Sequence, residues 1–143
     1  MAEASPVEVF DLIVAALAGT DLKQAVSHMG VMHEGSPRLD RSFAVMPATA
    51  QGFVDGRIQN TTAGARIGDR YTIELGHALK PKAGLNAYRV ALQDLQAAII
   101  AITNGLVSEV NVSDIARTIE GGGQYLVTRF SLRVFYRMSL VQS

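Results

Sequence analysis

The sequence contains no cysteine, which excludes disulfide bridges and thiolate metal sites. It also lacks net charge, because its 13 basic residues balance 13 acidic ones. The bulk charge therefore favours neither the presence nor the absence of a nucleic-acid partner. A length of 143 residues fits one domain with one hydrophobic core, which can fold without covalent cross-links.

Long apolar runs and targeting signals are also missing. The longest uncharged run, Leu95–Ser108, is shorter than the roughly 20 residues that a membrane helix needs. Glu3, Glu8 and Asp11 occupy the N-terminal region, where a secretory signal would carry positive charge. We therefore expect a protein made in a cytoplasm, with no membrane partner.

The motifs of common enzymes are absent as well. There is no G-x-S-x-G, no P-loop and no G-x-G-x-x-G between a strand and a helix. His28 and His33 are not accompanied by a carboxylate pattern of a metal site. His77 lies in an alternating segment, where we expect a structural histidine. These absences predict a protein that is not an enzyme and binds no metal or other cofactor.

Two segments have the periodicity of amphipathic helices. Residues 6–18 follow Ser5, a good N-cap, and begin with Pro6, which suits the first helical turn. A second helix of about 20 residues is predicted by an apolar stripe with alternating spacings of three and four. That stripe consists of Leu85, Tyr88, Leu92, Leu95, Ile99, Ile102 and Leu106.

The remaining patterns predict strands at 41–47, 70–79, 115–120 and 125–138. The order of elements is typical of an α+β domain, a mostly antiparallel sheet of about four strands with helices packed on one face. Residues 48–66 are small, polar and rich in glycine. We expect them to form a mobile loop, because long loops in compact domains are usually functional or disordered.

The last strand has an unusual face. Arginine recurs every fourth residue, at Arg129, Arg133 and Arg137, and Tyr125 and Phe135 lie on the same side. The row can be a solvated surface, a nucleic-acid surface or a protein–protein interface. Arginine and aromatic residues are enriched at interfaces, which favours the last reading.

Charge is also distributed unevenly along the chain. Residues 1–65 hold 4 basic and 7 acidic residues, whereas residues 66–143 hold 9 and 6. Oppositely charged halves suit contacts between copies of the chain.

The order of elements resembles that of the tail terminator proteins of long-tailed bacteriophages. The resemblance extends over nearly the whole chain, from the capped helix through "RSFAVMP" and "RYTIELGHAL" to "GLNAYRVALQDLQAAIIAI" and "ARTIEGGGQYLVTRFSLRVFYRM". It rests on this order and pattern and not on a signature motif. A neck or head–tail connector ring protein and a small ligand-binding or enzymatic α+β domain remain alternatives.

The resemblance implies a structural virion protein that forms a homo-oligomeric ring, in this family a hexamer. Such a ring caps the tail tube, ends its polymerisation and presents a surface to the head. The implied partners are other copies of the chain, the tail tube protein and the head–tail connector or neck proteins. DNA could pass through the lumen without sequence-specific binding. The residues that we expect at the assembly interface are Arg57, Arg66, Tyr125, Arg129, Arg133, Phe135 and Arg137.

Overall fold

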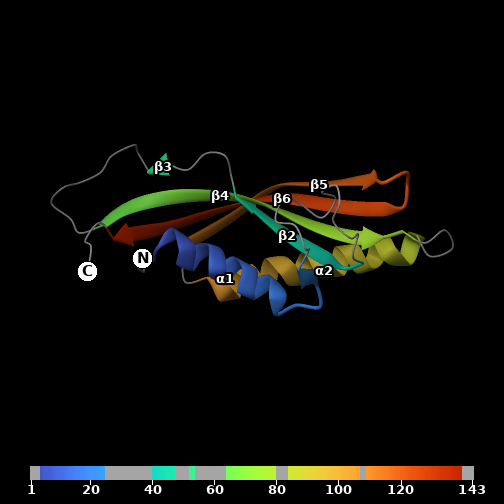
Figure 1. The fold of residues 1–143 in the computed structure, drawn as a ribbon, viewed down its shortest axis with the longest axis horizontal. Coiled ribbons are helices and arrows are strands. Elements are labelled where there is room, and N and C mark those ends of the chain that lie inside the picture. Colours follow the sequence, from blue (N-terminus) through green and yellow to red (C-terminus); the bar gives the residue numbers. More distant parts are fainter. Residues whose placement is uncertain are drawn as a thin grey trace.

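The structure is a computed structural model, and it describes residues 4–24, 40–47, 52–53, 64–79, 84–106 and 109–139. Within these ranges the chain forms one layer of helices and one sheet (Figure 1). In chain order the elements are α1 (Pro6–Ala18), β1 (Lys23–Gln24), β2 (Ser42–Pro47), β3 (Gly52–Phe53), β4 (Gly64–Ala78), α2 (Gly84–Gly105), β5 (Glu109–Glu120) and β6 (Tyr125–Ser139).

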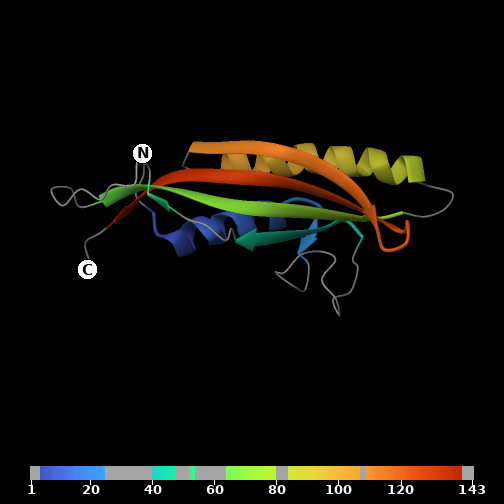
Figure 2. The ribbon, with the colours of Figure 1, turned by 90° about the horizontal axis from the view of Figure 1, so that it is seen from above.

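The sheet has the strand order β1-β2-β4-β6-β5, and β3 pairs with β4 outside this path. Figure 2 shows the strands side by side in this order. The α+β class predicted from the sequence is confirmed. The predicted four strands correspond to β2, β4, β5 and β6, and the two short strands are additions. The sheet is mixed, because β1 pairs with β2 in parallel while the other pairs are antiparallel.

Strands β4 and β6 form the central pair of the sheet. They pair along 15 residues each, from Gly64 opposite Ser139 to Ala78 opposite Tyr125. The segment 48–66, expected to be a mobile loop, therefore contains β3 and the first residues of β4. Its remaining residues, 48–51 and 54–63, lie outside the described residues, and so does Arg57.

Both helices pack on one face of the sheet, which we call the helix face (Figure 1). The cap of α1 is the predicted one, with the backbone N–H of Glu8 donating to Ser5 Oγ at 3.1 Å. Three turns of α1 contribute Val9, Ile13 and Leu17 to the core. The sheet contributes alternate residues of β4 and β6, among them Ile73, Leu75, Phe130, Leu132, Val134 and Tyr136.

The predicted buried stripe of α2 is wrong in its first half. Leu85, Tyr88 and Leu92 are 77%, 42% and 39% exposed. The helix instead turns its small residues inward, and Gly105 lies so close to α1 that a Cβ there would stand 3.0 Å from Ala16 Cβ. The larger side chains at the start of α2 are consequently left outside. The buried residues of α2 are Ala91, Asp94, Leu95, Ala98 and Ile102.

Candidate functional site

The face opposite the helices, which we call the outer face, carries the arginine row of β6. It differs sharply between its two ends. At one end Tyr125 and Val127 are buried and form a small second cluster with Ala44. At the other end Arg133 is exposed and Phe135 is half-buried. We call the first the closed end and the second the open end.

Tyr125 was expected at an assembly surface, but it lies inside the subunit. It is 2% exposed, and its Oη lies 2.9 Å from Ser42 Oγ. Its ring lies over the bare backbone of Gly76, where a Cβ would stand only 2.1 Å from the hydroxyl. The side chain is therefore a packing element of the closed end and is not available to a partner of the folded subunit.

Arg129 is neutralised within the subunit. Its guanidinium forms an ion pair with the buried carboxylate of Glu74, and a second one with Glu120 at 3.0 Å. Burial acts to lower the pKa of Arg129, but the two carboxylates outweigh this effect and raise it. A further hydrogen bond, to Thr118 Oγ1 at 3.2 Å, completes the network. The side chain thus serves the closed end and contributes little free charge to the surface.

The open end stacks two guanidinium groups against one aromatic ring. The Cζ atom of Arg133 lies 4.7 Å from the ring centroid of Phe135, and that of Arg66 lies 5.3 Å from it. Arg66 also forms an exposed ion pair with Glu109 at 3.2 Å. Cation–π contacts of this kind are worth about 0.5–1 kcal/mol at exposed sites. They hold the guanidinium planes in place without neutralising their charge.

Gly68 makes room for this stack. A Cβ at Gly68 would stand 3.1 Å from Arg133 Nη2 and 3.3 Å from the ring of Phe135. Arg133 and Phe135 can therefore lie close against the backbone of β4. A residue with a Cβ at position 68 would push the guanidinium of Arg133 and the ring of Phe135 away from the sheet.

The register of β4 against β6 places arginines directly opposite one another. Arg70 is the cross-strand partner of Arg133, and Arg66 is the partner of Arg137. Like charges in such positions are destabilising. Among the described residues Glu109 is the one carboxylate that forms an ion pair with Arg66, Arg70 or Arg133. We call Arg66, Arg70, Arg133 and Phe135 the arginine patch, a surface with excess positive charge and an aromatic centre.

The structure therefore divides the predicted interface residues. Arg66, Arg133 and Phe135 come together in the arginine patch, and the half-buried Arg137 lies beside them. Tyr125 and Arg129 belong to the closed end. Arg70 was not predicted. Its position in the alternation of β4 placed it on the outer face, but the register against β6 was needed to place it beside Arg133.

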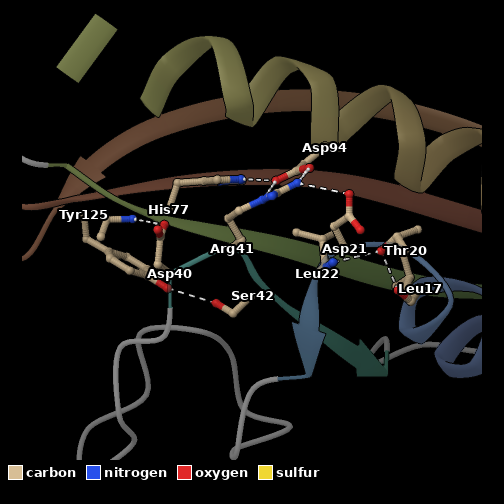
Figure 3. A network of polar contacts seen from close by, with 11 residues as sticks. Leu17, Thr20, Asp21, Leu22, Asp40, Arg41, Ser42, His77, Asp94 and Tyr125 are labelled. Atoms are coloured by element: carbon tan, nitrogen blue, oxygen red, sulfur yellow. Dashed lines mark hydrogen bonds and ion pairs between the residues drawn. The ribbon is translucent and has the colours of Figure 1, made fainter. Parts of the chain in front are cut away.

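A cluster of polar side chains lies on the helix face, where β2, β4 and α2 meet (Figure 3). His77 Nε2 lies 2.7 Å from Asp94 Oδ2, and both residues are buried. The guanidinium of Arg41 donates to the same carboxylate at 2.8 and 3.1 Å. Burial opposes the charged form of Asp94, but the hydrogen bonds from Arg41 and His77 prevail and lower its pKa. This network joins α2 and β4 to Arg41, which directly precedes β2. His77 is buried with a carboxylate partner, as expected for a structural histidine, but only one of its two ring nitrogens is paired among the described residues.

A pocket of about 210 Å³ adjoins this network, lined by Arg41, His77 and residues of α2 including Asn86 and Val90. His77 Nδ1 is buried and has no hydrogen-bond partner in the described part of the chain. The described ranges contain no group of three or more histidine or carboxylate side chains arranged to hold a metal ion. No helix within them is both long and apolar enough to cross a membrane.

Comparison with known protein families and with curated protein sequences finds no match to this chain.

Proposed function

We propose that this protein is a structural subunit that acts by assembling with copies of itself. The observation that carries the proposal is the arginine patch. The exposed Arg66 and Arg133 both lie over the half-buried ring of Phe135, and the exposed Arg70 is the cross-strand partner of Arg133. Among the described residues these three arginines have a single acidic ion-pair partner, Glu109. Arrays of arginine and aromatic side chains are typical of protein–protein interfaces. A folding role does not account for the array, because exposed charges add little to stability.

A second exposed surface supports the same proposal. The apolar side chains of Leu85 and Tyr88 on α2 lie outside the core, and Ile119 of the neighbouring β5 is 64% exposed. Arg117 of β5 lies over the ring of Tyr88, with its Cζ 5.8 Å from the centroid. β5 is also the last strand of the sheet in the described chain. A subunit of a ring that also docks axially needs several such surfaces.

The finer proposal is that the assembly is a ring that ends a bacteriophage tail. It rests on the resemblance in the order of elements. The α+β fold and the long central strands are compatible with this resemblance. In this proposal the ring is a hexamer that caps the tube, located in the virion at the tail or neck. Its partners are the tail tube protein and the connector or neck proteins, and DNA passes through the lumen. A connector ring is the alternative within the same class.

The proposal is tested by measuring the mass of the purified protein and its effect on tube growth. Native mass spectrometry should find a closed oligomer, six times the subunit mass of 15.3 kDa in the terminator case. Addition of this oligomer to the polymerising tube protein of the same phage should arrest elongation at substoichiometric amounts, as seen by electron microscopy. A protein that stays monomeric at all concentrations would refute self-assembly. An oligomer that leaves tube growth unchanged but binds the portal side would favour the connector ring.

One observation favours a ligand-binding function as a second candidate. His77 lines a pocket, and its buried Nδ1 has no hydrogen-bond partner among the described residues, although buried polar groups are normally paired. The pocket volume of about 210 Å³ is below the roughly 300–1,000 Å³ of typical ligand sites. We therefore rank this function second. A thermal-shift screen of small polar compounds tests it, with His77→Gln as the variant that should abolish any shift.

A further inference from the structure

We infer that the arginine patch of one subunit binds the outward face of α1 of the next subunit. This inference rests on the proposed function, and it specifies the contact from which the assembly is built. The occupant is a second copy of this chain.

The outward face of α1 carries acidic and apolar side chains, whereas the charged residues of the arginine patch are basic. Glu8 and Asp11 are exposed, and neither has an ion-pair partner in the described residues. They are flanked by Val7 and Leu12, which are 68% and 39% exposed. The helix contains no basic residue. α1 therefore presents two carboxylates among apolar side chains, which is the counterpart of arginines around a phenylalanine ring.

The charged residues have a similar Cβ–Cβ spacing on the two surfaces. Glu8 and Asp11 are three residues apart on a helix, which places their Cβ atoms roughly 5–6 Å apart. Arg70 and Arg133 are direct cross-strand partners, so their Cβ atoms are about 4.5–5.5 Å apart. Each carboxylate can thus face one guanidinium, while the flanking apolar side chains cover Phe135.

The two surfaces lie on opposite sides of the subunit. The patch is on the outer face of the sheet, and α1 lies beneath the helix face (Figure 1). A contact between them is head-to-tail, and such contacts produce a ring when the rotation between copies closes. The same contact relieves the like-charge opposition of Arg70 and Arg133, for which the described residues provide no ion-pair partner.

The experiment uses two charge-reversed variants of the full chain. The patch variant carries Arg70→Glu and Arg133→Glu, and the helix variant carries Glu8→Arg and Asp11→Arg. Lys23→Glu, at an exposed position of β1 that belongs to neither surface, is the control, with the same charge change per residue as the patch variant. Circular dichroism establishes the fold of each variant, and native mass spectrometry measures assembly.

Each reversed variant alone should have the monomer mass, and the control should assemble as the unaltered chain does. A mixture of the two reversed variants should regain the assembled mass with equal numbers of each. The reason is that each altered surface then meets the opposite charge on its neighbour. If reversal unfolds a variant, glutamine replaces the same residues, and assembly should weaken at least about tenfold.

Three results would overturn the inference. Wild-type assembly by both reversed variants would show that another contact builds the ring, and the proposed function would stand. Failure of the mixture to assemble would show that the two surfaces are not partners. If a patch variant loses binding to random-sequence duplex DNA but keeps the assembled mass, the patch is a nucleic-acid surface. A wild-type chain that is monomeric throughout refutes the proposed function itself.

Discussion

The two ends of the outer face are built from the same kinds of residue and reach opposite outcomes. At each end an aromatic side chain of β6 lies over or beside a glycine of β4, and an arginine of β6 stands nearby. At the closed end the arginine, Arg129, is bound by two glutamates. At the open end Arg133 faces Arg70. One end is consequently part of the folded core, and the other keeps an excess of positive charge at the surface.

The strand that carries the arginines does not decide their role. The residues opposite them on β4 do so. Glu74 lies opposite Arg129, whereas Arg70 lies opposite Arg133. An acidic residue at the facing position of β4 therefore gives a stabilising ion pair with the arginine of β6. A basic residue there gives a surface with excess positive charge.

Alanine substitution should affect the two arginines very differently. Arg129→Ala removes the ion-pair partner Arg129 from Glu74, which is 4% exposed. It should lower the free energy of unfolding by about 3 kcal/mol, at the lower end of the cost of breaking a buried pair, because Arg129 is itself partly exposed. Arg133→Ala should cost less than about 1 kcal/mol. Urea titration measures both, and equal losses would contradict the distinction between the ends.

The two glycines provide the next contrast. Gly76→Ala forces the buried ring of Tyr125 to move, and overpacking of this kind costs about 1–3 kcal/mol. Gly68→Ala meets the end of the exposed Arg133 side chain, which can shift toward solvent, so the loss should be below about 1 kcal/mol, partly offset by the reduced freedom of the unfolded chain. Thermal unfolding compares the two. The Gly68 variant should instead weaken self-association, and a stability loss as large as that of Gly76→Ala would show that the open end is also core.

The smallest expected effect concerns one hydroxyl at the closed end. Tyr125→Phe removes the hydrogen bond with Ser42, and such bonds contribute about 0.5–1.5 kcal/mol. A double-mutant cycle with Ser42→Ala isolates the coupling between the two hydroxyls. Because Tyr125 is buried, self-association should not change. A loss of assembly with an intact fold would restore Tyr125 as an interface residue.

The sequence predicts the elements of this fold better than it predicts their neighbours. Helix α1 has the expected bounds, and β6 has the expected division into a core face and an outer face. The pairing of Glu74 with Arg129 joins residues that are 55 positions apart. Local periodicity contains no information about such register, so the partition of the arginine row could not be foreseen.

The error in α2 has a similar cause. The spacing of Leu85, Tyr88 and Leu92 fits a buried stripe as well as the spacing of the alanines does. The contact between α2 and α1, at Gly105 and Ala16, decides which stripe is buried. The acid within the buried side, Asp94, was a signal in the sequence that this side needs polar partners, since buried charges are paired.

The two glycines of β4 have a further consequence, for the fidelity of strand alignment during folding. Strands that slip by one residue exchange their faces, and the apolar pattern forbids this. A slip by two residues preserves the pattern, so it needs another safeguard. It would place the ring of Phe135 above Arg66 or Arg70 in place of Gly68, and the ring of Tyr125 above a residue with a Cβ in place of Gly76. Gly68 and Gly76 of β4 therefore accommodate the rings of Phe135 and Tyr125 of β6 in only one alignment of the 15-residue pairing.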